Sequence, residues 1–218
     1  MEDAGQCDHT ALSCSLAIEA ARRLGRLQQQ AFQDQILPSL LIRCEGNHFH
    51  QQTAAVCQWA MKQQAPEVQA DLQRIASLLE QAHSFFGELA EQLSELPSTL
   101  VHGDFWSGNI AVAGNDIHFI DWGDALWGVG GISIINLFMT SDCELDKANA
   151  QIWHAYEQGW DRPISHAYQQ ACLVASAVTD LVIDQAIATS CGQGPERLRG
   201  LLPGLRRLEA LLAGQATC

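Results

Sequence analysis

Apolar residues recur at helical spacing along most of the chain. The first stripe places Ala17, Ala21, Leu24, Leu27 and Ala31 on one face of a helix. Similar stripes predict helices over residues 54–61, 66–96, 132–139, 148–158, 164–189 and 196–213. Proline is favoured in a first helical turn and stops a helix when it follows one, so Pro66 and Pro97 set the expected limits of the longest segment.

The middle of the chain has a different pattern. Residues 99–101 are short and extended, and His102-Gly103-Asp104 ends this run. Residues 110–113 and 117–120 are rich in β-branched and apolar side chains, and Gly114-Asn115 between them is typical of a hairpin turn. No internal repeat and no Pro/Gly/Ser-rich linker divides the chain. The expected fold is therefore mainly α, with one small β hairpin in its middle.

Composition narrows the class of protein. Of the 218 residues, 47% are hydrophobic and 17% are charged, which is enough apolar material for a packed core. The formal net charge is −13, so neither a nucleic acid nor an anionic membrane is expected as a partner, because both require basic surface. The eight cysteines include no C-x-x-C pair, and Glu2 and Asp3 do not resemble a secretory leader. These features favour a soluble cytoplasmic protein.

One segment carries candidate chemistry. Asp104 precedes Asn109 by five residues, the spacing found in kinase catalytic loops, where the Asp accepts a hydroxyl proton and the Asn holds a metal ion. A hairpin that leaves this loop and returns would bring Asp121 beside Asn109. One amide oxygen and one carboxylate suit Mg²⁺, which prefers oxygen ligands and keeps several waters.

Several nearby residues have two open interpretations. Asp124 could contact substrate or metal, or it could be a solvated turn acid. Trp122 could stack on a substrate ring, although packing beneath the loop is the commoner role for such a residue. The acids Asp142, Glu144 and Asp146 could attract a cationic substrate or simply favour a helix start.

A second cluster suggests a metal by composition alone. Cys44, His48 and His50 form a C-x-x-x-H-x-H pattern that could hold zinc. The pattern lacks an obvious fourth ligand and matches none of the usual zinc spacings, so a metal site is the less favoured interpretation.

The motif His102-Gly103-Asp104, Asn109 and Ile120-Asp121-Trp122 resembles the aminoglycoside phosphotransferase and choline kinase group of small-molecule kinases. The sequence Trp-Ser-Gly-Asn at 106–109 is also similar to the corresponding motif of the fructosamine (ketosamine) kinases. The resemblance implies the C-terminal lobe of a protein-kinase-like fold. It also implies Asp104 as general base with His102 supporting the catalytic loop, Asn109 and Asp121 as Mg²⁺ ligands, ATP as phosphoryl donor and a small-molecule hydroxyl as acceptor.

By this resemblance the whole chain, residues 1–218, is one phosphotransferase-like lobe. Its parts are a hinge remnant at 1–10, whose backbone near Glu2 and Asp3 would contact nucleotide, a helical region at 11–97, the catalytic loop and metal hairpin at 99–127, and a second helical region at 131–214.

The chain also departs from the family pattern. In the family, a Gly-Asp-Pro commonly follows the metal-binding Asp, and a second Asp then supports the catalytic loop. This chain has Gly128-Val129-Gly130 and Ser133 at those places. Neither Lys62 nor Lys147 follows a glycine-rich hairpin, so neither matches the lysine that binds the α- and β-phosphates of ATP. The N-terminal ATP lobe is therefore expected to be absent. Three interpretations follow: a small-molecule kinase, a non-catalytic remnant or binding module of that family, and a metal-dependent hydrolase using Asp104 and Asp121.

Overall fold

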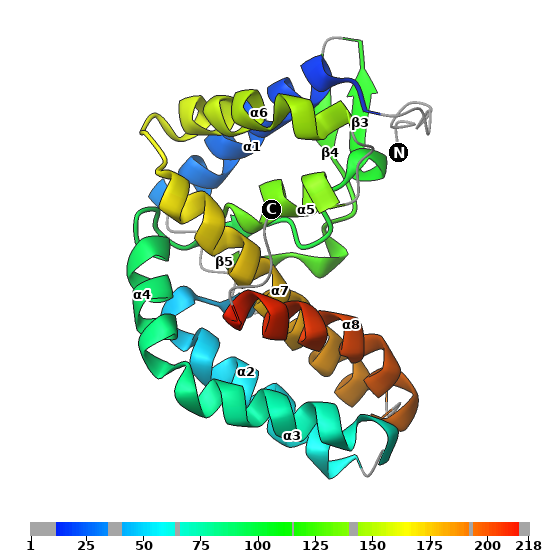
Figure 1. Cartoon of the computed structure of the whole chain (residues 1–218). Helices are drawn as coiled ribbons and strands as arrows, with labels where there is room; N and C mark the ends of the chain where they lie inside the picture. Colours follow the sequence, from blue (N-terminus) through cyan, green and yellow to red (C-terminus); the bar gives the residue numbers. More distant parts are fainter. Residues whose placement is uncertain are drawn as a thin grey trace. The chain divides into compact units, whose positions relative to one another are not determined.

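The computed structural model describes residues 12–34, 41–63, 66–114, 116–139, 144–191 and 194–213. The chain forms two compact units, each built from two separate segments. Unit 1 consists of Met1–Arg43 and Leu96–Gln169, and unit 2 consists of Cys44–Glu95 and Gln170–Cys218. The elements are mostly helices, labelled along the chain in Figure 1, in agreement with the mainly α fold expected from the sequence.

Two glycines let the long helices of unit 1 come into close contact. α1 (Cys14–Gln33) crosses α6 (Glu144–Trp160), and α5 (Ile132–Met139) also contacts α6. A Cβ at Gly25 would lie 2.7 Å from the Tyr156 carbonyl oxygen, and a Cβ at Gly159 would lie 2.4 Å from the Arg22 carbonyl oxygen. Both values are below normal contact distance, so the backbones approach this closely only because both side chains are hydrogen atoms.

Unit 1 contains more β structure than the sequence predicted. The expected hairpin is present: β3 (Ile110–Ala113) pairs antiparallel with β4 (Asp116–Phe119). A second, three-stranded sheet has the order β1-β5-β2, formed by β1 (Ile42–Cys44), β5 (Leu126–Gly128) and β2 (Thr99–Val101). β1 and β5 were not predicted, whereas β2, which is equally short, was expected as an extended run before His102-Gly103-Asp104.

A buried polar network joins the elements of unit 1. The Gln28 side chain on α1 donates to the Gly130 carbonyl at 3.2 Å and accepts from the Tyr156 hydroxyl at 2.5 Å. The Thr99 hydroxyl donates to the Gln28 carbonyl at 2.6 Å. Buried polar groups are costly unless paired, so these bonds fix how α1, β2 and α6 meet.

Unit 2 is built from helices packed through apolar stripes. Its elements include α2 (Phe49–Lys62), α3 (Pro66–Gln81), α4 (His83–Leu93), most of α7 (His166–Ser190) and α8 (Gly194–Leu212), with a short 3₁₀ turn η1 (Gly46–His48) before α2. α3 packs on α2, α4 and α8. Apolar residues at helical spacing along α3 and α4 are buried, namely Leu72, Ile75, Leu79, Phe86, Leu89 and Leu93.

The single helix expected over residues 66–96 is wrong, because the chain breaks at Ala82 between α3 and α4. No Pro or Gly marks the break. The cause lies in tertiary contacts: the His50 ring packs on His83 and Phe86, and its Nε2 lies 3.2 Å from the Leu79 carbonyl oxygen. A carbonyl near the end of α3 thus gains a polar neighbour outside its own helix, which stabilises the end of the helix there.

The three residues Cys44, His48 and His50 have different environments: Cys44 is buried, His50 is half-buried and His48 is exposed. Cys44 is fully buried, and burial raises the pKa of its thiol to about 11, although Thr179 and Gln52 act to lower it. A cysteine binds zinc as a thiolate, and burial disfavours the thiolate of Cys44. Among the described residues, no group of three or more His, Cys, Asp or Glu side chains could hold a metal ion.

By length and composition alone, α7 could cross a membrane. An 18-residue window of this helix has a mean hydropathy of 1.6, and 56% of the window is buried. The core helix of a globular protein passes the same test, so α7 by itself is weak evidence for a span.

Candidate active site

The candidate site lies in unit 1 and begins where β2 ends. His102, Gly103 and Asp104 follow β2 directly, and a 3₁₀ turn, η2 (Ser107–Asn109), leads into the hairpin. A Cβ at Gly103 would lie only 2.1 Å from the carbonyl oxygen of Asp124. The loop therefore passes against the backbone after the hairpin, and only glycine fits at that point.

Asp104 and Asn109 are joined directly. The Asn109 side-chain amide donates to the Asp104 carbonyl at 2.7 Å and to Asp104 Oδ2 at 3.0 Å. Because both partners are acceptors, Nδ2 must face Asp104, and Asn109 Oδ1 faces away from it. Asn109 is 6% exposed, whereas Asp104 is exposed, so a buried amide holds a solvent-accessible carboxylate.

The hairpin returns the chain to Asn109, as expected from the sequence. Ile110 pairs with Phe119, and the Ile120 backbone N–H donates to the Asn109 carbonyl at 3.1 Å. Asp121 is the next residue, so it stands at the same end of the hairpin as Asn109.

The backbone of Asp121 has a left-handed conformation, with φ 58° and ψ 64°. Such a conformation is uncommon outside glycine, and it tends to occur at functional positions. The Asp121 side chain is exposed, and it precedes η3 (Trp122–Asp124).

His102 is buried beneath this arrangement. Its side chain is 0% exposed, and its Nε2 lies 2.8 Å from the Ile120 carbonyl oxygen. The ring packs against Trp122 and Phe105, with centroid distances of 4.5 Å and 5.6 Å. Nδ1 has no hydrogen-bond partner among the described residues. This environment suits support of the loop, the role that the resemblance implies, because the ring does not reach solvent.

The other predicted site residues have mixed environments. Trp122 is half-buried, with its indole N–H donating to the Phe119 carbonyl at 2.9 Å, while Asp124 is exposed. Glu2, Asp3 and Asp142 lie outside the described residues, as do the side chains of Glu144 and Asp146.

Sequence reasoning missed the residues that hold the loop from α5. Ser133, flagged only as a departure from the family pattern, accepts from the His102 backbone N–H at 3.1 Å and donates to the His102 carbonyl at 3.3 Å. Asn136 was not predicted at all, and its side-chain amide donates to the Gly103 carbonyl at 2.7 Å. Its spacing of three residues from Ser133 on one helix could have identified it, because such residues share a face.

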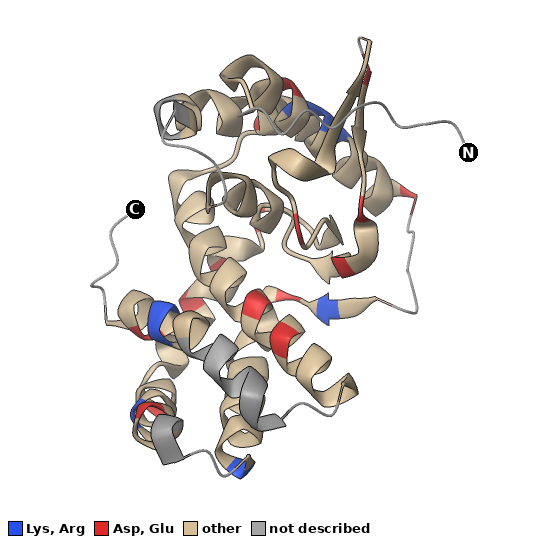
Figure 2. Ribbon diagram, turned by 90° about the vertical axis from the view of Figure 1, so that its right-hand side faces the viewer, with Lys and Arg blue, Asp and Glu red and all other residues tan. Residues whose placement is uncertain are grey.

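The donor set fits magnesium. Asn109 Oδ1 faces away from Asp104, the Asp121 carboxylate is exposed, and both are hard oxygen ligands near one end of the hairpin. Mg²⁺ commonly takes only one or two protein oxygens and completes its shell with water and phosphate oxygens. Acidic residues outnumber basic ones in the chain, and Figure 2 shows their positions on the ribbon.

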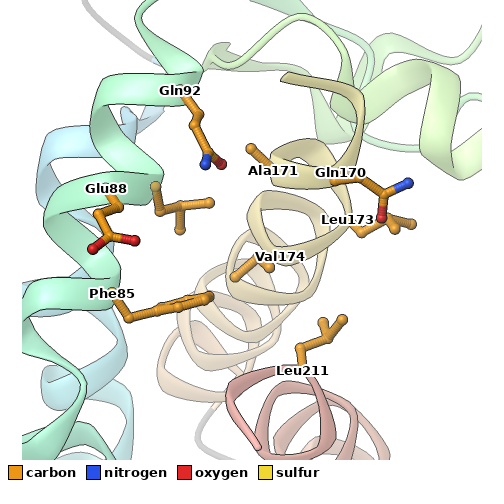
Figure 3. Close-up of a pocket in the computed structure, with 9 residues that line it drawn as sticks. Phe85, Glu88, Gln92, Gln170, Ala171, Leu173, Val174 and Leu211 are labelled. Carbon is orange, nitrogen blue, oxygen red and sulfur yellow. The ribbon is translucent and has the colours of Figure 1, made fainter. Parts of the chain in front are cut away.

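Unit 2 contains a separate pocket of about 180 Å³ between α4 and α7 (Figure 3). Its lining is Phe85, Glu88, Leu89, Gln92, Gln170, Ala171, Leu173, Val174 and Leu211. None of the predicted site residues belongs to it.

Comparison with known proteins agrees with the motif. Residues 2–164 match the phosphotransferase enzyme family (APH), so the chain belongs to that family. No curated protein matches it significantly in sequence.

Two solved structures resemble the chain. A choline kinase from Cryptosporidium parvum Iowa II superposes with a TM-score of 0.51 and 13% identity, covering 94% of this chain and 68% of that one. A spectinomycin phosphotransferase in complex with ADP and spectinomycin gives a TM-score of 0.40 and 14% identity, covering 88% of this chain and 61% of that one. The choline kinase likeness confirms the kinase-like fold.

Proposed function

We propose that the chain carries the catalytic side chains of an ATP- and magnesium-dependent phosphotransferase that acts on a hydroxyl group of a small molecule. The observation that supports this most is the double hydrogen bond from the Asn109 amide to Asp104, with Asp121 brought to the same hairpin end by the Ile120–Asn109 bond. Family membership and the kinase-like fold support the same reaction class.

Each side chain has a distinct role in this proposal. Asn109 Nδ2 donates a hydrogen bond to Asp104 Oδ2. Oδ1 of the exposed carboxylate therefore remains to accept the proton of the substrate hydroxyl. Asn109 Oδ1 and the Asp121 carboxylate would hold Mg²⁺, which would neutralise charge on the phosphates of ATP. The acceptor oxygen forms a bond to the γ-phosphorus as the bond to the β–γ bridging oxygen breaks, so ADP is the leaving group.

The substrate is proposed only as a class. The neighbour's name, choline kinase, points to a small hydroxyl compound. Aminoglycosides, choline-like alcohols and ketosamines are the open candidates, and the net charge of −13 suits those that carry an amine. The same charge argues against nucleic acid or an anionic membrane as a partner. A cytoplasmic location stays a prediction.

A second candidate is a binding module that keeps the fold without efficient turnover. The chain has two lysines, and Lys62 lies in α2 while Lys147 lies in α6. Neither is on a strand, so neither matches the lysine that contacts the nucleotide phosphates in kinases. Losing one preorganised electrostatic contact costs a rate factor of about 10²–10³.

Calorimetric titration of magnesium-ATP into the full chain, followed by an ADP-release assay with hydroxyl compounds of the three classes, distinguishes the candidates. The proposal expects binding that Asp121→Asn abolishes, and turnover that requires a hydroxyl acceptor. Binding without turnover for any acceptor would support the binding module. ATP-independent hydrolysis that requires Asp104 and Asp121 would support the hydrolase instead.

A further inference from the structure

α5 contacts the catalytic loop at two consecutive residues. The Ser133 hydroxyl bonds both backbone groups of His102, accepting from its N–H at 3.1 Å and donating to its carbonyl at 3.3 Å. One turn along α5, the Asn136 amide donates to the Gly103 carbonyl at 2.7 Å. The bonds come from one helix face and hold the chain just before Asp104.

We propose that Ser133 and Asn136 are positioning residues, which together set the geometry of both candidate active-site carboxylates through the backbone of His102 and Gly103. The inference rests on the phosphotransferase function proposed above. It assigns a role to Ser133, which stands where the family pattern has an aspartate, and to Asn136, one turn further along α5.

The path from α5 to Asp104 is short. Asn136 fixes the Gly103 carbonyl, and Gly103 is bonded directly to Asp104. Asp104 in turn accepts the Asn109 amide, so a displaced loop would also move Asn109.

The path to Asp121 passes through the His102 ring. Ser133 fixes the backbone of His102, and His102 Nε2 lies 2.8 Å from the carbonyl oxygen of Ile120, the residue before Asp121. The left-handed backbone at Asp121 needs its surroundings to hold it, because this conformation is unfavourable for a residue with a side chain. His102 provides such a restraint on the preceding residue.

A hydroxyl suits this position for a chemical reason. Ser133 is 0% exposed, and its hydroxyl can donate and accept at once, so it pairs both His102 groups. An ionised carboxylate only accepts, and it would leave the buried His102 carbonyl without this donor. Neither Ser133 nor Asn136 carries a titratable group.

Nuclear magnetic resonance on the full chain tests the inference directly. Ser133→Ala removes the hydroxyl with little change of shape, and Asn136→Asp keeps the shape but removes the donor. Each is expected to shift the Asn109 side-chain amide resonances, and Ser133→Ala to speed hydrogen exchange at the His102 amide. The control is Ser176→Ala, since Ser176 is a buried serine on α7 in unit 2, and it should leave these resonances unchanged.

Metal affinity and kinetics complete the test. With Mn²⁺ as a probe for the magnesium site, Ser133→Ala and Asn136→Asp should each weaken binding several-fold. In an active enzyme they should lower kcat by about tenfold to a hundredfold while changing the KM of the acceptor less, because misplaced reacting groups reduce rate more than binding. Ser176→Ala should change neither quantity.

The positioning role of α5 and the proposed kinase activity are contradicted by different results. Unchanged Asn109 resonances and His102 exchange in both variants overturn this inference, whatever the activity of the protein. An absence of turnover in the wild-type chain overturns the proposed kinase activity, while the resonances still decide whether α5 positions the loop.

Discussion

Polar side chains in the interior of unit 1 connect distant segments around the candidate catalytic loop, whereas in unit 2 the buried Thr53 bonds within its own helix and His50 contacts the Leu79 carbonyl on a neighbouring helix. In unit 1, Gln28 reaches Gly130 and Tyr156, and Ser133 reaches His102. In unit 2, the buried Thr53 hydroxyl donates to the Phe49 carbonyl of its own helix at 2.7 Å.

Unit 2 also has ion pairs at its surface that join distant segments. Arg74 and Arg206 pair with Glu209 and Asp71, linking α3 with α8, and these pairs are solvent-exposed. Exposed pairs contribute little to stability, while buried bonds between distant segments specify backbone positions. In unit 1 the buried polar bonds therefore hold the candidate catalytic loop in place, and in unit 2 the polar contacts accompany the packing of helices.

Replacing a carboxylate in each unit should have very different effects on turnover. Asp104→Ala or Asp121→Asn in unit 1 should lower turnover by at least about 10²–10³-fold, the typical loss for a preorganised electrostatic group. Both side chains are exposed, so the free energy of unfolding should change by less than about 0.5 kcal/mol. The control Asp71→Ala, in an exposed ion pair of unit 2, should leave turnover unchanged. Initial rates and thermal unfolding measure the two effects.

Added methyl groups at two helical glycines should act in opposite directions. Gly159→Ala places a Cβ 2.4 Å from the Arg22 carbonyl oxygen and 2.9 Å from the Arg26 nitrogen, both backbone atoms that cannot move easily. We expect destabilisation near the upper end of about 1–3 kcal/mol. Gly87→Ala on α4 meets nothing within 4 Å and should stabilise by about 0.5–1 kcal/mol. Denaturant unfolding compares them, and equal effects would contradict the glycine-mediated contact of α1 with α6.

Removing a buried hydrogen-bonding side chain should cost more in unit 1 than in unit 2. Gln28→Met takes a partner from both the Gly130 carbonyl and the Tyr156 hydroxyl and should cost about 1–2 kcal/mol. Thr53→Val should cost less than about 1 kcal/mol, because the Phe49 carbonyl keeps its helical donor. The same denaturant experiment measures both losses in the free energy of unfolding, and a larger loss for Thr53→Val would contradict this expected difference between the two units.

The smallest effect concerns pH in unit 2. Partial burial raises the pKa of Asp180 from 3.8 to about 6, Arg207 opposes this shift, and Asp184 adds to it. The folded state therefore keeps a proton between pH 4 and 6 that the unfolded chain loses, so this group favours folding below pH 4 and that contribution is lost as pH rises through 6.

Asp180→Asn should therefore raise the melting temperature at pH 7–8 more than at pH 4. The side chain is 46% exposed, so water screens the interaction and the gain should stay below about 1 kcal/mol. A stabilisation of equal size at both pH values would show that ionisation of Asp180 is not its source.

The sequence predicted most helices and the hairpin, because helices with a continuous apolar face and a turn such as Gly114-Asn115 are local features. It failed at Ala82, where the break depends on His50, which is distant in sequence. It also failed for β1 and β5.

For the candidate site, the spacing of Asp104, Asn109 and Asp121 was enough to predict that the hairpin brings them together. The support from α5 was not predictable in the same way. Ser133 differs from the residue expected there, and Asn136 is marked only by its position one turn from Ser133, so the hydrogen bonds of both to the loop become visible in the folded arrangement.

The order of segments along the chain has a consequence for synthesis on the ribosome. Unit 1 has all its segments once Gln169 has been made, although residues 44–95 of unit 2 interrupt it. Unit 2 must wait for the C-terminal segment that supplies most of α7 and all of α8. Because chains emerge N-terminus first, the candidate catalytic loop can reach its final form while α2, α3 and α4 have only one another to pack on and still lack α8 and most of α7. During that interval nascent chains depend most on chaperones.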